Sequence, residues 1–222
     1  MLKLYSYYRS TASYRIRIAL NYKQLDYKIN AVDLIQGAQF DTNYLSHNKQ
    51  GRVPTLVDDD FEIGQSAAIL EYLEEKYPEP ALLPKNMQAR AWVRYLSQII
   101  ISDAHPLNNS SVLKFLANSL ELDKSKINVW YHHWLKICLD TFESLLATHP
   151  ECKEFCWGDK PTIADVCLIP QIYNAYRFNF SMNNYPTINR INQHCLSLPF
   201  FVKASPENQP DYQANRPGSA VP

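Results

Sequence analysis

The sequence lacks an excess of charge of either sign, and it lacks any apolar run long enough to cross a bilayer. Its 222 residues include 22 Lys and Arg against 22 Asp and Glu. Because these charges balance, there is no net basic field to attract nucleic acid or an anionic membrane surface. The first residues, Met1 to Tyr5, alternate as a strand does, so we expect no signal region. These absences favour a cytoplasmic protein that acts on small molecules or binds other proteins.

Cysteine is absent from the first half of the chain, and the total is odd. The five residues are Cys138, Cys152, Cys156, Cys167 and Cys195. This pattern does not suggest the disulfide framework of a secreted domain. Cys152 and Cys156 resemble a metal-binding pair only superficially, because no second pair or nearby His couple completes a zinc site. We therefore predict buried structural thiols and no metal.

The beginning of the chain predicts an α/β domain. Residues 2–7 and 27–32 alternate like strands, and residues 10–22 between them have helical spacing. Together they indicate a βαβ unit. A weakly helical stretch, 37–46, follows.

A β-hairpin and a strong helix are predicted next. Residues 53–57 and 61–63 flank an acidic turn, which is typical of a hairpin. Pro54 stands at the start of its strand, and the bond before it could be cis or trans. Helical spacing over residues 67–77 then predicts a helix with Ser66 as its N-cap.

A proline-rich segment divides the chain into two predicted domains. Residues 77–84 contain three prolines and cannot continue a helix. We therefore place one domain at residues 1–80 and a second at 86–222. The second carries helical spacing over 86–101 and 123–148 with little strand signal, so it should be all-helical.

Within the helical domain, Thr162 and Asp165 form a predicted capping box before an apolar run. Pro170 should bend or interrupt the helix that follows, and a further helix should begin at Tyr185-Pro186-Thr187. From Ser205 onward we expect a surface tail.

The stretch from Arg9 to Arg15 is the strongest candidate for a functional site. Its hydroxyls, at Ser10, Thr11 and Ser13, lie where alternating hydrophobicity changes to helical spacing. A helix start binds thiolates, phosphates or carboxylates, and Arg9 and Arg15 add positive charge. On spacing alone, Ser10 is more simply explained as a helix cap than as a catalytic residue.

The chain resembles the zeta class of the cytosolic glutathione transferases over nearly its whole length. The segment from Arg9 to Leu20 is similar to the class signature Arg-Ser-Ser-Cys-Ser-Trp-Arg-Val-Arg-Ile-Ala-Leu. Further matching segments are Val53-Pro54-Thr55-Leu56, Gln65-Ser66, residues 69–74, Pro106-Leu107, Ser111-Val112-Leu113, Asn174-Ala175, Arg177-Phe178 and residues 206–210. The resemblance implies an N-terminal thioredoxin-like domain of order βαβ-α-ββα followed by an all-α domain.

The resemblance also implies a glutathione site, with glutathione as a cofactor. Because Ala12 replaces the Cys of the signature, Ser10 is left as the main residue that activates the glutathione thiol, with Thr11 keeping a hydroxyl beside it. In this family Val53 pairs through its backbone with the cysteinyl part of glutathione. The implied glutathione-binding residues are Ser10, Thr11, Ala12, Ser13, Arg15, Gln39, Val53, Pro54, Gln65, Ser66, His105, Asn109 and Ser111.

By the same resemblance, the substrate is a small diacid and the reaction a cis–trans isomerisation. Maleylacetoacetate would be converted to fumarylacetoacetate, in tyrosine and phenylalanine breakdown, by reversible addition of the glutathione thiolate to the alkene. The predicted catalytic residues are Ser10, Arg9 and Thr11, and Arg9 and Arg177 would hold the substrate carboxylates. The resemblance further implies a homodimer.

Three alternatives stay open at this point. Maleylpyruvate isomerisation uses the same chemistry on a shorter diacid. Some zeta relatives transfer glutathione to small α-halo acids or dehalogenate them. A non-catalytic interaction protein of this fold is the third, although the retained Ser10, Gln65 and Ser66 argue against it.

Overall fold

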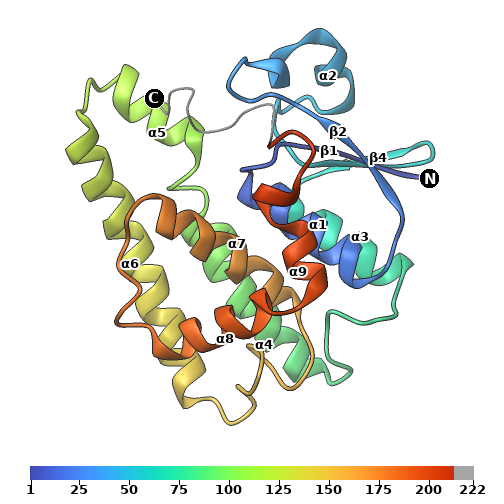
Figure 1. The fold of residues 1–222 in the computed structure, drawn as a ribbon, viewed down its shortest axis with the longest axis vertical. Helices are drawn as coiled ribbons and strands as arrows, with labels where there is room; N and C mark the ends of the chain where they lie inside the picture. Colours follow the sequence, from blue (N-terminus) through green and yellow to red (C-terminus); the bar gives the residue numbers. More distant parts are fainter. Residues whose placement is uncertain (213–222) are drawn as a thin grey trace. The chain divides into compact units, whose positions relative to one another are not determined.

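A computed structural model describes residues 1–212, which form a four-stranded sheet and a series of helices (Figure 1). The elements of the first 81 residues follow the predicted order βαβ-α-ββα. They are β1 (Leu2–Ser6), α1 (Thr11–Tyr22), β2 (Tyr27–Ala31), α2 (Thr42–His47), β3 (Thr55–Asp58), β4 (Phe61–Gly64) and α3 (Ser66–Lys76). A 3-10 turn, Ala38–Phe40, precedes α2, so the weak helical signal at 37–46 corresponds to two short pieces.

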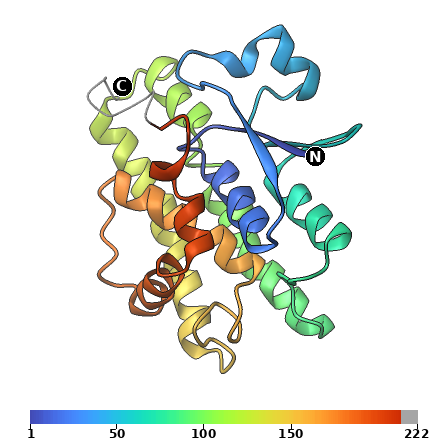
Figure 2. The ribbon, with the colours of Figure 1, turned by 45° about the vertical axis from the view of Figure 1, so that its right-hand side comes forward.

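The sheet is mixed, in the order β2-β1-β3-β4. Strand β1 runs parallel to β2 and antiparallel to β3, and β3 pairs with β4 as the predicted hairpin. Leu4 of β1 lies opposite Ile29 and Leu56 on the neighbouring strands and is fully buried. Helices α1 and α3 cover one face of the sheet, and α2 lies on the other (Figures 1 and 2). The thioredoxin-like order predicted from the sequence is confirmed.

Helix α1 is buried on nearly every side. Its apolar residues Ile16, Ile18 and Leu20 are inaccessible to solvent, and so are the side chains of Arg15 and Arg17. Two arginines this deep need hydrogen-bond acceptors, because burying an unsatisfied charge is costly. Arg17 has them in the Ser6 hydroxyl, at 3.1 Å, and in backbone carbonyls.

The hairpin is followed by a helix start that differs from the prediction. The Val53–Pro54 bond, left open by the sequence, is cis. Ser66 is the first residue of α3 rather than its N-cap, and Gln65 occupies the cap position with φ of 65° and no side-chain cap bond. The predicted Ser66 cap is therefore wrong. The reason is that the Ser66 hydroxyl accepts a hydrogen bond from Arg15 instead.

Residues 82–195 form an all-helical unit, as predicted. Its elements are α4 (Met87–Gln98), a π-helical turn (Ile99–Ala104), α5 (Ser110–Asn118), α6 (Lys124–Thr148), α7 (Ile163–Arg177) and α8 (Pro186–Leu196), the last ending one residue past the unit. The capping box at the start of α7 is confirmed, with Asp165 accepting from the Thr162 backbone N–H at 2.8 Å and from its hydroxyl at 2.7 Å. Helix α8 begins where predicted. Pro170, however, does not interrupt α7, which continues to Arg177.

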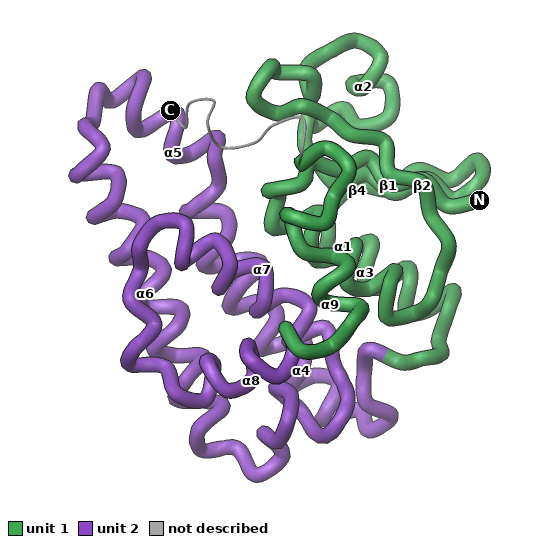
Figure 3. Tube along the Cα trace, viewed as in Figure 1, with its two compact units in different colours: residues 1–81, 196–222 green, residues 82–195 purple. Residues whose placement is uncertain are grey.

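The end of the described chain groups with its beginning. Contacts divide the described residues into unit 1, Met1–Ala81 with 196–212, and unit 2, Leu82–Cys195 (Figure 3). Helix α9 (Pro199–Ala204) packs on α1, and a 3-10 turn (Pro206–Asn208) follows it. The expected surface tail from Ser205 is therefore wrong as far as Tyr212, because Pro206 and Gln209 are buried. Residues 213–222 lie outside the described part. The boundaries 1–80 and 86–222 stay a prediction.

Both units have apolar cores. The five cysteines are free thiols, four of them buried and Cys152 half-buried. Burial raises the pKa of Cys138 to about 11, so this thiol stays protonated at neutral pH. Within residues 1–212 no helix is both long and apolar enough to span a membrane.

Candidate functional site

Ser10 lies at the N-terminus of α1, between strand and helix. Its backbone is extended, with φ of −65° and ψ of 116°, and its hydroxyl oxygen accepts the Ser13 backbone N–H at 3.2 Å. Thr11 and the half-buried Ala12 are the first residues of the helix. The Ser10 hydroxyl is thus a helix cap, yet it still carries a hydrogen that it can donate. Cap and donor to a ligand coexist in one side chain, at the positive end of the helix.

Arg9, the preceding residue, lies against a pair of aromatic rings whose centres are 4.7 Å apart. Its guanidinium carbon lies 5.8 Å from the ring centre of Tyr7 and 5.5 Å from that of Tyr8. Such cation–π contacts restrain the side chain. Burial raises the pKa of Tyr7 well above its ordinary 10.0, although the charge of Arg9 opposes this, so Tyr7 stays a neutral phenol. Arg9 therefore provides a restrained cation beside Ser10.

Arg15 connects the starts of α1 and α3. Its Nη1 donates to the Ser66 hydroxyl at 3.1 Å, and both residues are buried. Next to Ser66, the Gln65 side chain is exposed and donates to Gln50 Oε1 at 2.8 Å. A direct hydrogen bond thus joins the two segments that the sequence singled out, Ser10–Arg15 and Gln65–Ser66.

The loop before β3 is held by residues that the sequence analysis did not select. The Tyr44 hydroxyl donates to the Arg52 carbonyl at 2.6 Å and contacts the Thr55 hydroxyl at 2.9 Å. Asn48 donates to both of the same groups, at 2.8 and 3.0 Å. These contacts fix the backbone on either side of Val53. No pattern in the sequence marks Tyr44 or Asn48, because their partners, the Arg52 carbonyl and the Thr55 hydroxyl, come near them only in the folded chain.

Gln39 provides a test of whether unit 1 fits a peptide ligand. It is buried, and its Oε1 has no hydrogen-bond partner among the described residues. An unsatisfied buried amide oxygen costs about 1 to 3 kcal/mol. A ligand with N–H donors, as glutathione has, would satisfy it. Together with the donors at the starts of α1 and α3, these residues fit glutathione.

The predicted residues of unit 2 form a second group around the start of α5. Asn109 is the N-cap of this helix and accepts from both the backbone N–H and the hydroxyl of Ser111, each at 2.9 Å. Asn109 Nδ2 lies 3.4 Å from His105 Nε2. The preceding residue, Asn108, was missed from the sequence: it is buried, and its amide atoms lack partners in the part of the chain that the structure describes.

Arg177 ends α7 and is exposed. Its Nη1 donates to Asn174 Oδ1 at 3.0 Å, one turn back along the helix. Its charge also reaches the buried Tyr131, whose pKa is raised by burial and lowered by Arg177, with a net rise. Within residues 1–212 no group of three or more His, Cys, Asp or Glu has the arrangement of a metal site.

Comparison with known proteins gives consistent matches over nearly the whole chain. Residues 4–81 match the family model described as "Glutathione S-transferase, N-terminal domain". The maleylacetoacetate isomerase of Dictyostelium discoideum is 45% identical over 94% of this chain and 94% of its own length.

Solved structures are similar to the same extent. The holo structure of a bacterial maleylpyruvate isomerase of the zeta class has a TM-score of 0.93 and 40% identity, covering 94% of this chain and 99% of the other. A maleylacetoacetate isomerase from Methylobacterium extorquens AM1, with bound malonate and glutathione, has a TM-score of 0.91 and 37% identity, covering 94% and 98%.

Proposed function

Because the chain belongs to the family of maleylacetoacetate isomerases, the zeta class of the glutathione S-transferases, we propose that it is a glutathione-dependent cis–trans isomerase. Its preferred substrate is maleylacetoacetate, which it converts to fumarylacetoacetate. The observation that carries the proposal is the Ser10 hydroxyl at the start of α1, with the Arg9 cation next to it. A thiol to be activated and an anion to be held need those two groups side by side.

Bound glutathione supplies a thiolate that adds to the conjugated alkene, permits rotation about the resulting single bond and leaves again. A free thiol has a pKa of about 8.5 and is only slightly ionised at neutral pH. Ser10 donates a hydrogen bond to the sulfur, and the α1 N-terminus adds a positive potential; both lower the thiol pKa. Thr11 and Ala12 contribute backbone N–H groups at the same helix start, and Ser13 lies one residue further.

Arg9 and Arg177 bind the carboxylates of the dianionic substrate. The planar guanidinium suits this task because it donates two parallel hydrogen bonds to one carboxylate. Arg9 also stabilises the negative charge that develops on the substrate carbonyl oxygen during addition. The Tyr7 and Tyr8 rings against it restrict the side chain beforehand, which reduces the entropy lost when substrate binds.

The other predicted residues hold the tripeptide. Val53 pairs through its backbone next to Pro54, Gln65 and Ser66 take the γ-glutamyl end at the start of α3, and Arg15 orients Ser66. Four further residues are more weakly assigned to the glycyl end of glutathione and to nearby anions. They are Gln39, His105, Asn109 and Ser111.

Maleylpyruvate is the second candidate substrate. The specific observation that favours it is the TM-score of 0.93 and 40% identity to a maleylpyruvate isomerase. Both diacids require the same thiolate chemistry and the same two arginines. We further propose a cytoplasmic homodimer.

The test is an ultraviolet assay of purified protein with maleylacetone, a stable analogue of maleylacetoacetate, with and without glutathione. The expected result is glutathione-dependent isomerisation while total thiol stays constant. A parallel assay with maleylpyruvate ranks the two substrates by kcat/KM. Consumption of thiol with a halo acid, together with no turnover of either diacid, would contradict the isomerase proposal and indicate a glutathione transferase.

A further inference from the structure

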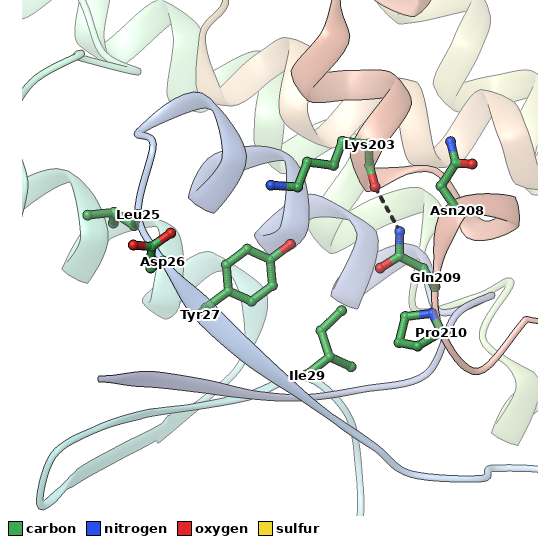
Figure 4. Close-up of a pocket in the computed structure, with 8 residues that line it drawn as sticks. All are labelled: Leu25, Asp26, Tyr27, Ile29, Lys203, Asn208, Gln209 and Pro210. Carbon is green, nitrogen blue, oxygen red and sulfur yellow. Dashed lines mark hydrogen bonds between the residues drawn. The ribbon is translucent and has the colours of Figure 1, made fainter.

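The end of α9 and the segment after it are held by side chains that the proposed chemistry does not use. The buried Arg17 of α1 donates from Nε to the Ala204 carbonyl at 2.9 Å. Gln209 is buried, and its amide donates to the Lys203 and Ser205 carbonyls at 3.0 and 2.7 Å. Figure 4 shows the first of these Gln209 bonds, in a cavity of about 200 Å³ that Gln209 lines together with Tyr27 and Ile29 of β2. The backbone leading to Asp211 is thereby fixed.

Asp211 and Tyr212 both contact one residue, Tyr8. The Asp211 carboxylate accepts the Tyr8 backbone N–H at 2.8 Å, and the Tyr212 ring meets the Tyr8 ring edge-on, 5.6 Å between centres. From the other side, Arg17 Nη2 donates to the Tyr8 carbonyl at 2.9 Å. Asp211, 203 positions along the chain, and Arg17, nine positions along, thus hold the two peptide groups of Tyr8, which is 3% exposed.

Tyr8 in turn determines where Arg9 lies. It precedes Arg9 directly, so fixing its peptide groups fixes the Arg9 backbone, and its ring lies against the Arg9 guanidinium. An unrestrained arginine loses side-chain entropy when it is ordered. A contact that orders Arg9 before substrate arrives therefore favours substrate binding.

We propose that Asp211 and Tyr212 are positioning residues for Arg9 and set the enzyme's preference for dianionic substrates. This inference rests on the proposed function, in which Arg9 holds a substrate carboxylate. Asp211 acts through the Tyr8 backbone and Tyr212 through the Tyr8 ring. Neither residue touches the reacting atoms.

The kinetic test compares Asp211→Ala with Asp211→Asn, which keeps an oxygen that can accept the Tyr8 N–H. We expect Asp211→Ala to lower kcat/KM for maleylacetone about tenfold, mainly through KM, because small displacements of a positioning group have effects of this size. Asp211→Asn should stay within about threefold of the parent, and glutathione affinity should be unchanged in both. Asp60→Ala, which removes the same charge from the exposed β3–β4 turn, is the control.

A double-mutant cycle separates positioning from a general structural role. If Asp211 acts through Arg9, Asp211→Ala in an Arg9→Lys background changes kcat/KM by less than about twofold. An undiminished tenfold loss in that background would overturn the inference. Tyr212→Ala should behave as Asp211→Ala does, and Tyr212→Phe as the parent.

A readout that does not depend on activity keeps the two proposals distinguishable. In a ¹⁵N–¹H correlation spectrum, the Arg9 Nε–H signal, assigned by its loss in Arg9→Lys, should be displaced by the ring currents of Tyr7 and Tyr8. Asp211→Ala and Tyr212→Ala should return it towards the position of a solvated arginine. If the parent protein fails to isomerise maleylacetone, the proposed function falls, while this signal still decides the positioning. An unmoved signal in both variants would overturn the positioning.

Discussion

Individual side chains in this site have two roles, and Ser10 is the clearest example. Its oxygen caps α1 by accepting the Ser13 N–H, and its hydrogen can be donated to a thiolate. The change from alternating to helical spacing was enough to locate Ser10 in the sequence. Gln39, Tyr44 and Asn48 could not be found in that way, because burial of the first and the loop contacts of the others depend on tertiary structure.

The two roles of Ser10 predict different results for Ser10→Ala and Ser10→Thr. Ser10→Ala should lower kcat/KM at pH 7 by about 10- to 100-fold, because the glutathione thiol returns towards its free pKa of about 8.5. Since the thiolate is the reactive form, the rise of kcat/KM with pH should move to higher pH in this variant. Ser10→Thr keeps a hydroxyl and should keep the parent profile. The measurement is the pH–rate profile, together with the ultraviolet absorbance of bound thiolate.

Loss of the cap is measured separately in the same variants. Ser10→Ala should destabilise the protein by about 1 kcal/mol in urea unfolding, the usual cost of losing an N-cap. If kcat/KM falls only as far as the loss of folded protein explains, and the pH–rate profile does not shift, Ser10 is a helix cap alone.

At the scale of elements, local patterns predicted most of the fold, and the errors occurred where long-range contacts intervene. Helix α1 and the box at Thr162 and Asp165 follow from neighbouring residues, and both were predicted. The Ser66 cap was wrong because Arg15, 51 positions away, takes the hydroxyl. The tail was wrong for the same kind of reason, since Asp211 accepts the Tyr8 backbone N–H across 203 positions.

The connection between α1 and α3 gives a prediction at this scale. Lys23, at the end of α1, is buried and donates to Glu74 at 2.8 Å and to the Tyr77 and Pro80 carbonyls at 2.7 and 3.0 Å. Lys23→Met should destabilise the protein by about 3 to 5 kcal/mol, because the Glu74 carboxylate then stays buried without the lysine charge. Urea unfolding measures the change.

The matched control removes the second charge as well. Lys23→Met with Glu74→Met should recover most of the lost stability, since an apolar pair of similar volume replaces a buried ion pair at little cost. If the double variant is as unstable as Lys23→Met, the two carbonyl contacts rather than the Glu74 charge explain the loss.

For the whole molecule, the balanced charge predicts no nucleic-acid or membrane partner, and the proposed chemistry uses local fields instead of a net charge. Helix starts and single arginines provide these fields, and their effect does not depend on net charge. Through the family resemblance, the sequence proposes which residues belong to the site, and that assignment stays a prediction. It could not predict the contacts that order Arg9, because Asp211 and Tyr212 lie in a segment with no regular pattern of hydrophobicity.

The final prediction concerns the stability of the whole chain when glutathione is bound. A ligand at 100 times its Kd that binds only the folded state stabilises it by about 2.7 kcal/mol. In a chain of 222 residues, this corresponds to a rise in Tm of roughly 5 to 10 °C.

S-methylglutathione, which lacks an ionisable thiol, should retain part of the rise through the contacts of Gln39, Gln65 and Val53. In Ser10→Ala the two ligands should give equal shifts, because the contact that distinguishes them is gone. Differential scanning calorimetry at one fixed concentration of both ligands measures all four cases, and an undiminished difference in Ser10→Ala would assign recognition of the thiolate to the backbone N–H groups of α1 instead.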